Sequence, residues 1–200
     1  MFDLFCVTNR RLCSDDFLRR IEAIARQKPS GVILREKDLP ENEYLALALD
    51  VIAVCGQAGV PCILHRFPGA AAALGQREIH LPLPVLRALP HEEKAYFRRI
   101  GVSCHSAAEV REAETLGCTY VTAGHIFETD CKKGLAGRGL PFLREVCGCT
   151  GVPVYAIGGI TPQNLRDIKN AGAAGACLMS SLMTCCDPAA YFHSLRETIS

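Results

Sequence analysis

Near the C-terminus the sequence reads Val152-Pro-Val-Tyr-Ala-Ile-Gly-Gly-Ile-Thr-Pro162. A short apolar run ends there at a glycine pair, and a segment with helical spacing, Pro162–Asn170, follows it. The next apolar run, Gly175–Met179, comes soon after that segment. A strand, a helix and another strand in this order are typical of a parallel sheet built from strand–helix units.

The same unit recurs along the whole chain. Eight runs rich in Val, Ile and Leu predict eight strands, and the segments between several of them carry apolar residues at i, i+3 and i+4. Eight units in 200 residues average about 25 residues each, which predicts a compact single-domain (β/α)8 TIM barrel (an α/β fold) over residues 1–200. The predicted strands are Asp3–Thr8, Gly31–Arg35, Pro61–His65, Glu78–Leu81, Ile100–Ser103, Tyr120–Ala123, Val152–Ile157 and Gly175–Met179. The predicted helices are Asp15–Gln27, Glu41–Gly56, Ala107–Leu116, Pro162–Asn170 and Pro188–Thr198.

An open, doubly wound sheet is the alternative architecture. It usually needs fewer strands at this length, and no Gly-x-Gly-x-x-Gly turn follows the first predicted strand. Within the barrel, Pro82 and Pro84 predict that the fourth connection is a stub rather than a full helix.

The composition narrows the class of partner. The net charge is +1, with 22 basic and 21 acidic residues spread through the chain, so we expect no nucleic acid and no membrane surface as a partner. This charge balance favours small molecules as partners. The apolar N-terminal run is short and has no basic leader, which predicts a cytoplasmic protein.

Twelve cysteines raise the question of disulfides or metal. Most of them lie inside apolar runs, and no Cys-x-x-Cys pair or zinc-ligand spacing occurs. We therefore expect buried, inert thiols. Cys131 is the exception, because it lies beside Lys132 and Lys133 in the predicted active loop, where a thiol gains reactivity.

The predicted active loop is Gly124–Gly139. A TIM barrel carries its chemistry at the C-terminal ends of its strands, and this loop follows the sixth one with a mixture of histidine, acidic, basic and glycine residues. His125 comes directly after the strand, and imidazole can take and return a proton near neutral pH, so we predict that His125 is a general acid/base. The alternative is a structural histidine.

The last two strands predict a phosphate site. Gly158 and Gly159 follow the seventh strand, and Ser180 and Ser181 follow the eighth. Backbone amides and hydroxyl groups at these positions can surround a phosphate dianion. The alternative is a tight turn and two serine caps.

Further polar residues follow other strands. Arg35 and Lys37 flank Glu36, so strand alternation aims both cations to one side, toward an anionic substrate group; surface ion pairing is the alternative. Ser103 and His105 either position a polar substrate atom or belong to the start of the next helix. His65 and His80 also face this mouth, and their spacing assigns them no role.

Four motifs resemble those of one family over essentially the whole chain: Leu34-Arg-Glu-Lys37, Gly101-Val-Ser-Cys-His105, Ala123-Gly-His-Ile-Phe-Glu-Thr129 and Ala156-Ile-Gly-Gly-Ile160. They are similar to motifs of the thiamine phosphate synthase superfamily. The predicted active loop resembles the TenI branch, the thiazole tautomerases, because the synthases typically carry a proline at the position of His125.

The resemblance implies a substrate and a reaction. TenI-type enzymes convert a dihydrothiazole carboxylate phosphate into its aromatic tautomer, 2-(2-carboxy-4-methylthiazol-5-yl)ethyl phosphate, by a proton shift that His125 would catalyse. Gly158, Gly159, Ser180 and Ser181 would hold the phosphate. The other expected substrate-binding residues are Arg35, Lys37, His65, Ser103, His105, Thr129 and Lys132. The resemblance implies no cofactor and no metal, and a homodimer.

Two departures from the synthases support this branch. Synthases hold magnesium and pyrophosphate with an Asn-Asp pair after the third strand and an acidic residue after the fourth, where this chain has Leu64-His-Arg66 and His80-Leu-Pro-Leu-Pro84. Because Mg²⁺ needs oxygen ligands, we expect no metal site. Two alternatives stay open: a thiamine phosphate synthase with unusual ligands, and a non-catalytic paralogue that binds a phosphate ligand as a regulator.

Overall fold

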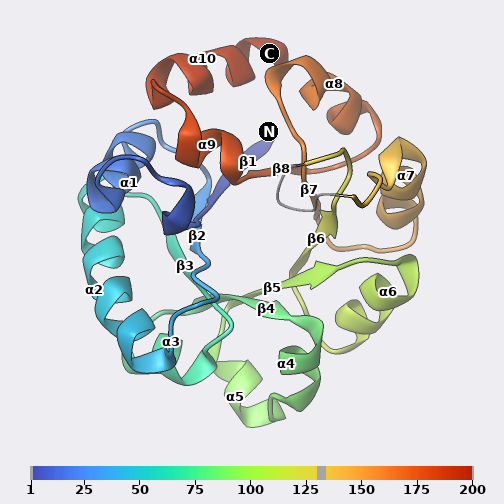
Figure 1. The fold of residues 1–200 in the computed structure, drawn as a ribbon. Helices are drawn as coiled ribbons and strands as arrows, with labels where there is room; N and C mark the ends of the chain where they lie inside the picture. The colour runs from blue at the N-terminus through green and yellow to red at the C-terminus, as the bar shows by residue number, and fades with distance from the viewer. Residues whose placement is uncertain (1, 130–133, 200) are drawn as a thin grey trace.

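The computed structural model describes residues 2–129 and 134–199 and shows a closed barrel of parallel strands inside a ring of helices (Figure 1). The strands follow one another around the barrel in chain order, and β1 closes it by pairing with β8, with Asp3 opposite Gly175. The predicted TIM barrel is thus confirmed, and the open sheet is excluded because it would leave its two edge strands unpaired. The strands are β1 (Asp3–Val7), β2 (Gly31–Leu34), β3 (Cys62–His65), β4 (Glu78–Pro82), β5 (Arg99–Cys104), β6 (Tyr120–Gly124), β7 (Val154–Ile157) and β8 (Gly175–Leu178).

Each predicted strand is present, with its ends shifted by no more than two residues. The strands were detectable because parallel strands covered by helices are buried on both faces and therefore read as continuous apolar runs. β2 and β3 show this directly, since every residue in them is buried.

Helices connect the strands on the outside of the barrel (Figure 1). They are η1 (Arg10–Leu12), α1 (Phe17–Ala25), α2 (Glu41–Gln57), α3 (Pro68–Ala73), α4 (Leu83–Ala88), α5 (His91–Tyr96), α6 (Ala107–Thr115), α7 (Gly139–Gly148), α8 (Pro162–Asn170), α9 (Ser180–Thr184) and α10 (Pro188–Ile199). The five predicted helices correspond to α1, α2, α6, α8 and α10. None of the helices within the described ranges is both long and apolar enough to cross a membrane.

The prediction of a stub after β4 is wrong. Two short helices, α4 and α5, fill this connection. Pro82 precedes α4 and Pro84 lies in its first turn, where a backbone N–H would have no intrahelical partner. The prolines therefore begin a helix here.

Aromatic rings fill the barrel near the N-terminal ends of its strands. The ring centroids of Phe5 and Tyr155 lie 4.9 Å apart, and those of Tyr120 and Tyr155 lie 5.4 Å apart. Gly101 makes room for this layer, because a Cβ there would lie 1.9 Å from Cζ of Tyr120. The filled base leaves the C-terminal ends of the strands as the place for polar side chains inside the barrel.

Candidate active site

His125 follows β6 directly and lies almost completely inside the protein. It is 7% exposed, and its peptide bond to Gly124 is cis. A Cβ added to Gly158 would come within 2.5 Å of the His125 Cβ. The structure therefore brings the predicted acid/base against the turn that was predicted to bind phosphate.

The two ring nitrogens of His125 have different surroundings. Nε2 lies 3.2 Å from the backbone carbonyl oxygen of Leu135, which can only accept a hydrogen bond, so Nε2 carries the proton of the neutral ring. Nδ1 is buried and has no hydrogen-bond partner within residues 2–129 and 134–199. Such unpaired buried atoms are uncommon in native proteins, and a bare ring nitrogen supplies the lone pair that a general base needs.

The turn at Gly158 and Gly159 packs against the backbone that leads away from His125. Gly158 has φ +101° and Gly159 has φ +65°. A Cβ on Gly159 would lie 2.4 Å from the carbonyl oxygen of Glu128, and the Phe127 N–H donates a hydrogen bond to the Gly158 carbonyl at 3.0 Å. Both glycines are thus required by a tight turn, which was the alternative interpretation, while phosphate binding by this turn stays a prediction.

Ser180 and Ser181 begin α9 and are half-buried. Because β7 and β8 pair, the ends of these strands bring the two serines to the same part of the mouth as Gly158 and Gly159. TIM barrels frequently hold phosphate at this place, beside a short extra helix after the last strands. The four residues thus follow two paired strands, and phosphate binding by them stays a prediction.

Glu36 anchors the segment after β2. It is 1% exposed, and its carboxylate accepts hydrogen bonds from the Thr8 hydroxyl at 2.6 Å and from the Arg10 backbone N–H at 3.1 Å. The Arg10 guanidinium adds an ion pair at 3.2 Å and makes a second one with Asp38 at 2.7 Å. The hydrogen bonds from Arg10 lower the pKa of Asp38 to about 2. The acid between the two predicted substrate cations therefore faces β1 and its following loop.

Arg35 and Lys37 reach other neighbours. Arg35 Nη1 lies 3.9 Å from the Met179 sulfur, which precedes α9, and the charges of Arg35 and Lys37 both act on His65. Arg35 and Lys37 thus have other neighbours than Glu36 between them, as expected when successive side chains of an extended segment point to opposite sides. Both charges act on His65 at the end of β3, and the Arg35 charge also acts on His80 in β4.

Replacing Glu36 by glutamine is expected to lower the free energy of unfolding by about 2 kcal/mol, because an amide N–H₂ would then face the donors of Arg10 in a buried site. Urea denaturation measures this loss. Asp38→Asn is the matched control, since it breaks the more exposed contact of the same guanidinium and should cost less. Equal losses for the two variants would contradict the anchoring role.

His65 and His80 lie together inside the barrel mouth. They are 4% and 3% exposed, and their rings stack with centroids 5.9 Å apart. Burial, together with the charge of Arg35, lowers the pKa of His80 to about 3. Burial and then the neighbouring positive charges lower the pKa of His65 well below its usual range. Both rings are therefore neutral near neutral pH.

Two buried neutral histidines predict a pH-dependent stability. The unfolded chain binds protons on these rings below about pH 6.5, while the folded protein does not until far lower pH. The stability is therefore complete above about pH 6.5 and is lost as pH falls below it, by about 1.4 kcal/mol per pH unit for a ring that stays neutral in the folded protein. For His80 this loss continues toward about pH 3. Urea denaturation over this range measures the slope. His80→Gln should reduce it, and His193→Gln, whose side chain is 75% exposed, should not.

The remaining predicted site residues lie in four different places. Ser103 is half-buried and its Oγ lies 2.8 Å from His80 Nε2, so it belongs to the mouth. His105 is exposed and its Nδ1 lies 3.0 Å from the Gly124 carbonyl oxygen, which places its ring beside β6. Thr129 is half-buried, at the end of the described part of the active loop. Lys132, with Cys131, lies outside the described residues; the described cysteines are all free.

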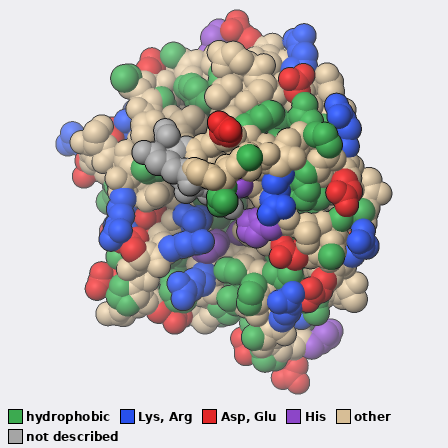
Figure 2. Space-filling model, turned by 45° about the vertical axis from the view of Figure 1, so that its right-hand side comes forward, with side chains coloured by type: hydrophobic (Ala, Val, Ile, Leu, Met, Phe, Trp, Pro, Cys, Tyr) green, Lys and Arg blue, Asp and Glu red, His purple; other side chains and the backbone are tan. Residues whose placement is uncertain are grey.

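Sequence reasoning missed Tyr120 and assigned no role to His80. Nδ1 of His80 lies 3.1 Å from the Tyr120 hydroxyl oxygen. One pattern in the sequence could have indicated this contact: polar residues occur in three successive strands. They are His80 in β4, Ser103 in β5, and Tyr120 and Thr122 in β6. Figure 2 shows histidine side chains near the centre of one face, with Lys and Arg side chains on either side.

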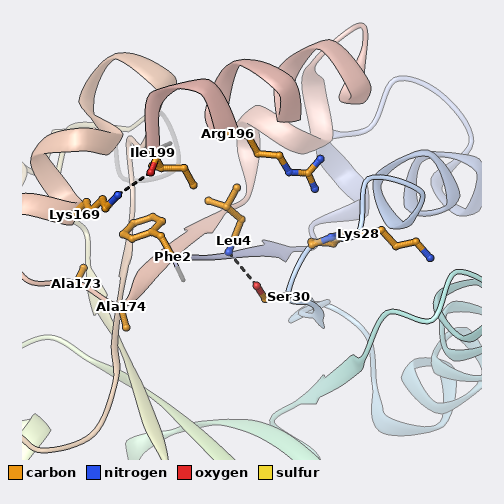
Figure 3. Close-up of a pocket in the computed structure, with 10 residues that line it drawn as sticks. Phe2, Leu4, Lys28, Ser30, Lys169, Ala173, Ala174, Arg196 and Ile199 are labelled. Carbon is orange, nitrogen blue, oxygen red and sulfur yellow. Dashed lines mark hydrogen bonds between the residues drawn. The ribbon is translucent and has the colours of Figure 1, made fainter.

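A cavity of about 680 Å³ lies elsewhere, at the N-terminal end of the barrel (Figure 3). Its three cations each donate to a backbone carbonyl: Lys169 to Ile199 at 2.7 Å, Lys28 to Ala58 and Arg196 to Gln27. None of the predicted site residues within the described ranges lines it. The cavity is therefore separate from the histidine-lined mouth.

Comparison with known proteins agrees with this architecture. The family model TMP-TENI, described as thiamine monophosphate synthase, matches residues 4–182. The chain belongs to the thiamine monophosphate synthase family. A thiamine-phosphate synthase of Syntrophomonas wolfei is 32% identical over 203 residues, covering 98% of this chain and 95% of that protein. A thiamine-phosphate synthase of Moorella thermoacetica is 34% identical over 178 residues, covering 86% and 82%.

The fold of this family member also matches a solved structure. Thiamine phosphate pyrophosphorylase from Pyrococcus furiosus superposes with a TM-score of 0.83 over 99% of this chain and 95% of that one, at 23% identity. The family model and the two sequence relatives confirm the predicted superfamily, and the solved structure agrees with the fold. Both sequence relatives bear the synthase name, so the similarity does not reach the finer prediction of a TenI-type tautomerase.

Proposed function

We propose that this family member is a thiazole tautomerase that aromatises a dihydrothiazole carboxylate phosphate in thiamine biosynthesis. The observation that carries the proposal is the buried, unpaired Nδ1 of His125 beside Gly158. A metal-free proton shift needs one group that first accepts and then returns a proton. The geometry of His125 suits that role because the Leu135 carbonyl holds the other ring nitrogen as a donor.

In the proposed reaction, the His125 imidazole takes the proton from the ring carbon that bears the carboxylate. The electron pair of that C–H bond moves into the ring, and the exocyclic carbon then takes the same proton back from the imidazole. No proton is gained or lost overall. The product ring is aromatic, which drives the reaction.

The cations at the mouth support the charged intermediate. As the proton leaves, negative charge spreads over the carboxylate and the ring, and preorganised positive groups stabilise such charge strongly in a site that excludes water. Arg35 and Lys37 have this role in the proposal, because both charges act on the buried His65 of the mouth. The turn at Gly158 and Gly159, with Ser180 and Ser181, would hold the phosphate.

The residues at the ends of β3 and β4 do not fit the magnesium ion of a synthase. Mg²⁺ prefers an octahedral set of oxygen ligands, whereas these positions carry His65 and His80 as neutral rings next to Arg35. The buried carboxylate of Glu36 is already engaged by Thr8 and Arg10. Among the described residues, no group of three or more His, Cys, Asp or Glu side chains has a metal-binding arrangement.

A thiamine-phosphate synthase is the second candidate, and the names of the relatives favour it. In that reaction Arg35 and Lys37 would contact the pyrophosphate of the pyrimidine substrate instead of a carboxylate. The two candidates differ in their substrates and in their need for a divalent ion, which makes them separable in one set of assays.

The test is to incubate the purified protein with the dihydrothiazole carboxylate phosphate in the presence of a chelator and to follow the ultraviolet spectrum. We expect conversion to the aromatic tautomer above the rate without protein. No conversion, together with magnesium-dependent joining of hydroxymethylpyrimidine diphosphate to thiazole phosphate, would instead establish the synthase. Binding of the thiazole phosphate without turnover in either assay would favour a regulatory paralogue.

A further inference from the structure

A chain of polar side chains crosses three neighbouring strands inside the barrel. Tyr120 Oη lies 3.1 Å from His80 Nδ1, and His80 Nε2 lies 2.8 Å from Ser103 Oγ. Thr122 Oγ1 donates to the same serine oxygen at 3.5 Å. Tyr120, His80 and Thr122 are 1%, 3% and 4% exposed, while Ser103 is half-buried at the mouth. The chain thus connects the aromatic base of the barrel to the candidate active site.

The direction of these hydrogen bonds follows from the proton count. His80 is neutral, because burial lowers its pKa to about 3, so its ring carries one N–H. Burial raises the pKa of Tyr120 well above its usual range, so its hydroxyl keeps a proton that needs an acceptor. The bare Nδ1 of His80 is the acceptor in contact, which leaves the ring proton on Nε2.

The serine at the end of this chain then keeps a proton that it can donate to a ligand. Ser103 Oγ accepts from the Nε2–H of His80 and from Thr122, so its own hydroxyl proton is left to be donated elsewhere. Ser103 is half-buried and lies near the C-terminal end of β5, the end at which the barrel mouth opens. In the opposite tautomer of His80, Nδ1 would carry the proton and could not accept from Tyr120, and the Ser103 hydroxyl would donate to the bare Nε2 instead of to a ligand.

We propose that Tyr120 and His80 are positioning residues that hold Ser103 as a hydrogen-bond donor to the substrate, so that the mouth selects a ligand with an anionic acceptor at this point. Arg35, whose charge reaches His80, makes a carboxylate the favoured acceptor. The identity of that carboxylate rests on the proposed function, whereas the tautomer of His80 does not.

The tautomer is tested without substrate. In ¹⁵N-labelled protein near neutral pH, bare and protonated imidazole nitrogens give separate resonances, and His80→Gln assigns those of His80. We expect a bare Nδ1 and a protonated Nε2. In Tyr120→Phe, which removes the donor to Nδ1, we expect the other tautomer to become populated. A protonated Nδ1 in the unmodified protein would overturn the proposal.

The selectivity is tested with two ligands by calorimetry: the aromatic thiazole carboxylate phosphate, and the same thiazole phosphate without its carboxylate. Tyr120→Phe should weaken binding of the first about 10-fold, the effect of losing one charged hydrogen bond, and leave the second unchanged. His80→Gln, whose amide can still donate to Ser103, should restore much of the affinity that His80→Leu loses. Equal weakening for both ligands would mean a general structural role and would overturn the proposal.

Ser103→Ala provides the decisive cross-check. If Tyr120 acts through the serine, adding Tyr120→Phe to Ser103→Ala should weaken carboxylate binding no further, whereas independent effects would add. Additive losses would contradict the proposal. If the unmodified protein binds neither thiazole ligand, the proposed function fails, while the resonance experiment still decides the tautomer.

Discussion

Replacing His125 by asparagine is expected to lower the turnover of the proposed tautomerase reaction by about 10²- to 10⁴-fold, the range that general acid/base groups contribute. Asparagine fills a similar volume and stays polar, but it has no nitrogen that takes up a proton. Binding of the aromatic product should change little, because the proposed phosphate and carboxylate contacts come from other residues. Turnover is read from the ultraviolet change and binding from calorimetry.

Two controls separate chemistry from folding in the His125 experiment. His125→Asn should stay folded with a melting temperature that falls only modestly, because the substitution removes one hydrogen bond within the described residues, from Nε2 to the Leu135 carbonyl, and none at Nδ1. His193→Asn is the matched histidine control, since its side chain lies on α10 and is 75% exposed. A folded His125→Asn protein with full turnover would remove His125 from the mechanism.

The barrel was predictable because its signal is local. Each strand is a short apolar run, buried on both faces, and each long helix carries its own periodic pattern. The connection after β4 was mispredicted for a local reason too: a proline can either break a helix or lie in its first turn, as Pro84 does in α4. Only the surrounding structure decides between these outcomes.

The candidate site was predictable one strand end at a time. His125, Arg35 and Ser103 each follow or end an apolar run, which marks the catalytic end of a barrel strand. The contacts that hold these residues in place could not be predicted from the sequence. The buried role of Glu36 depends on Thr8 and Arg10, which come from another strand end, and the bare Nδ1 of His125 depends on a carbonyl at Leu135.

The chain from Tyr120 to Ser103 shows the same limit most clearly, because strand register creates it. His80 pairs with Gly101 across one side of β5, and Tyr120 pairs with Gly101 across the other. The glycine has no side chain, so the tyrosine ring can extend over β5 and reach the imidazole. The sequence shows that residue 101 is glycine, but only the strand register shows that the side chains of His80 and Tyr120 meet over it.

Replacing Gly101 by alanine is therefore expected to lower the free energy of unfolding by about 3 kcal/mol, the upper part of the range for overpacking a core. Its Cβ would lie 1.9 Å from Cζ and 2.3 Å from the hydroxyl oxygen of Tyr120, so the ring must leave its place against Phe5 and His80. Urea denaturation measures the loss. Gly56→Ala is the matched control, because a Cβ there meets nothing within 4 Å, and alanine in an exposed helix should stabilise by about 0.5–1 kcal/mol.

The cause of the loss is separable by a second substitution. Tyr120→Val removes the atoms that a Gly101 Cβ would strike, so the double variant should be more stable than the sum of the two single effects predicts, by about 2 kcal/mol. If the two losses simply add, the clash is not with the tyrosine ring. Gly101→Ala should also disturb the His80 tautomer, since it displaces the Tyr120 hydroxyl that binds Nδ1 of His80. Stability and tautomer would then change together in Gly101→Ala, because one missing side chain in β5 makes room for both the packed base of the barrel and the polar chain above it.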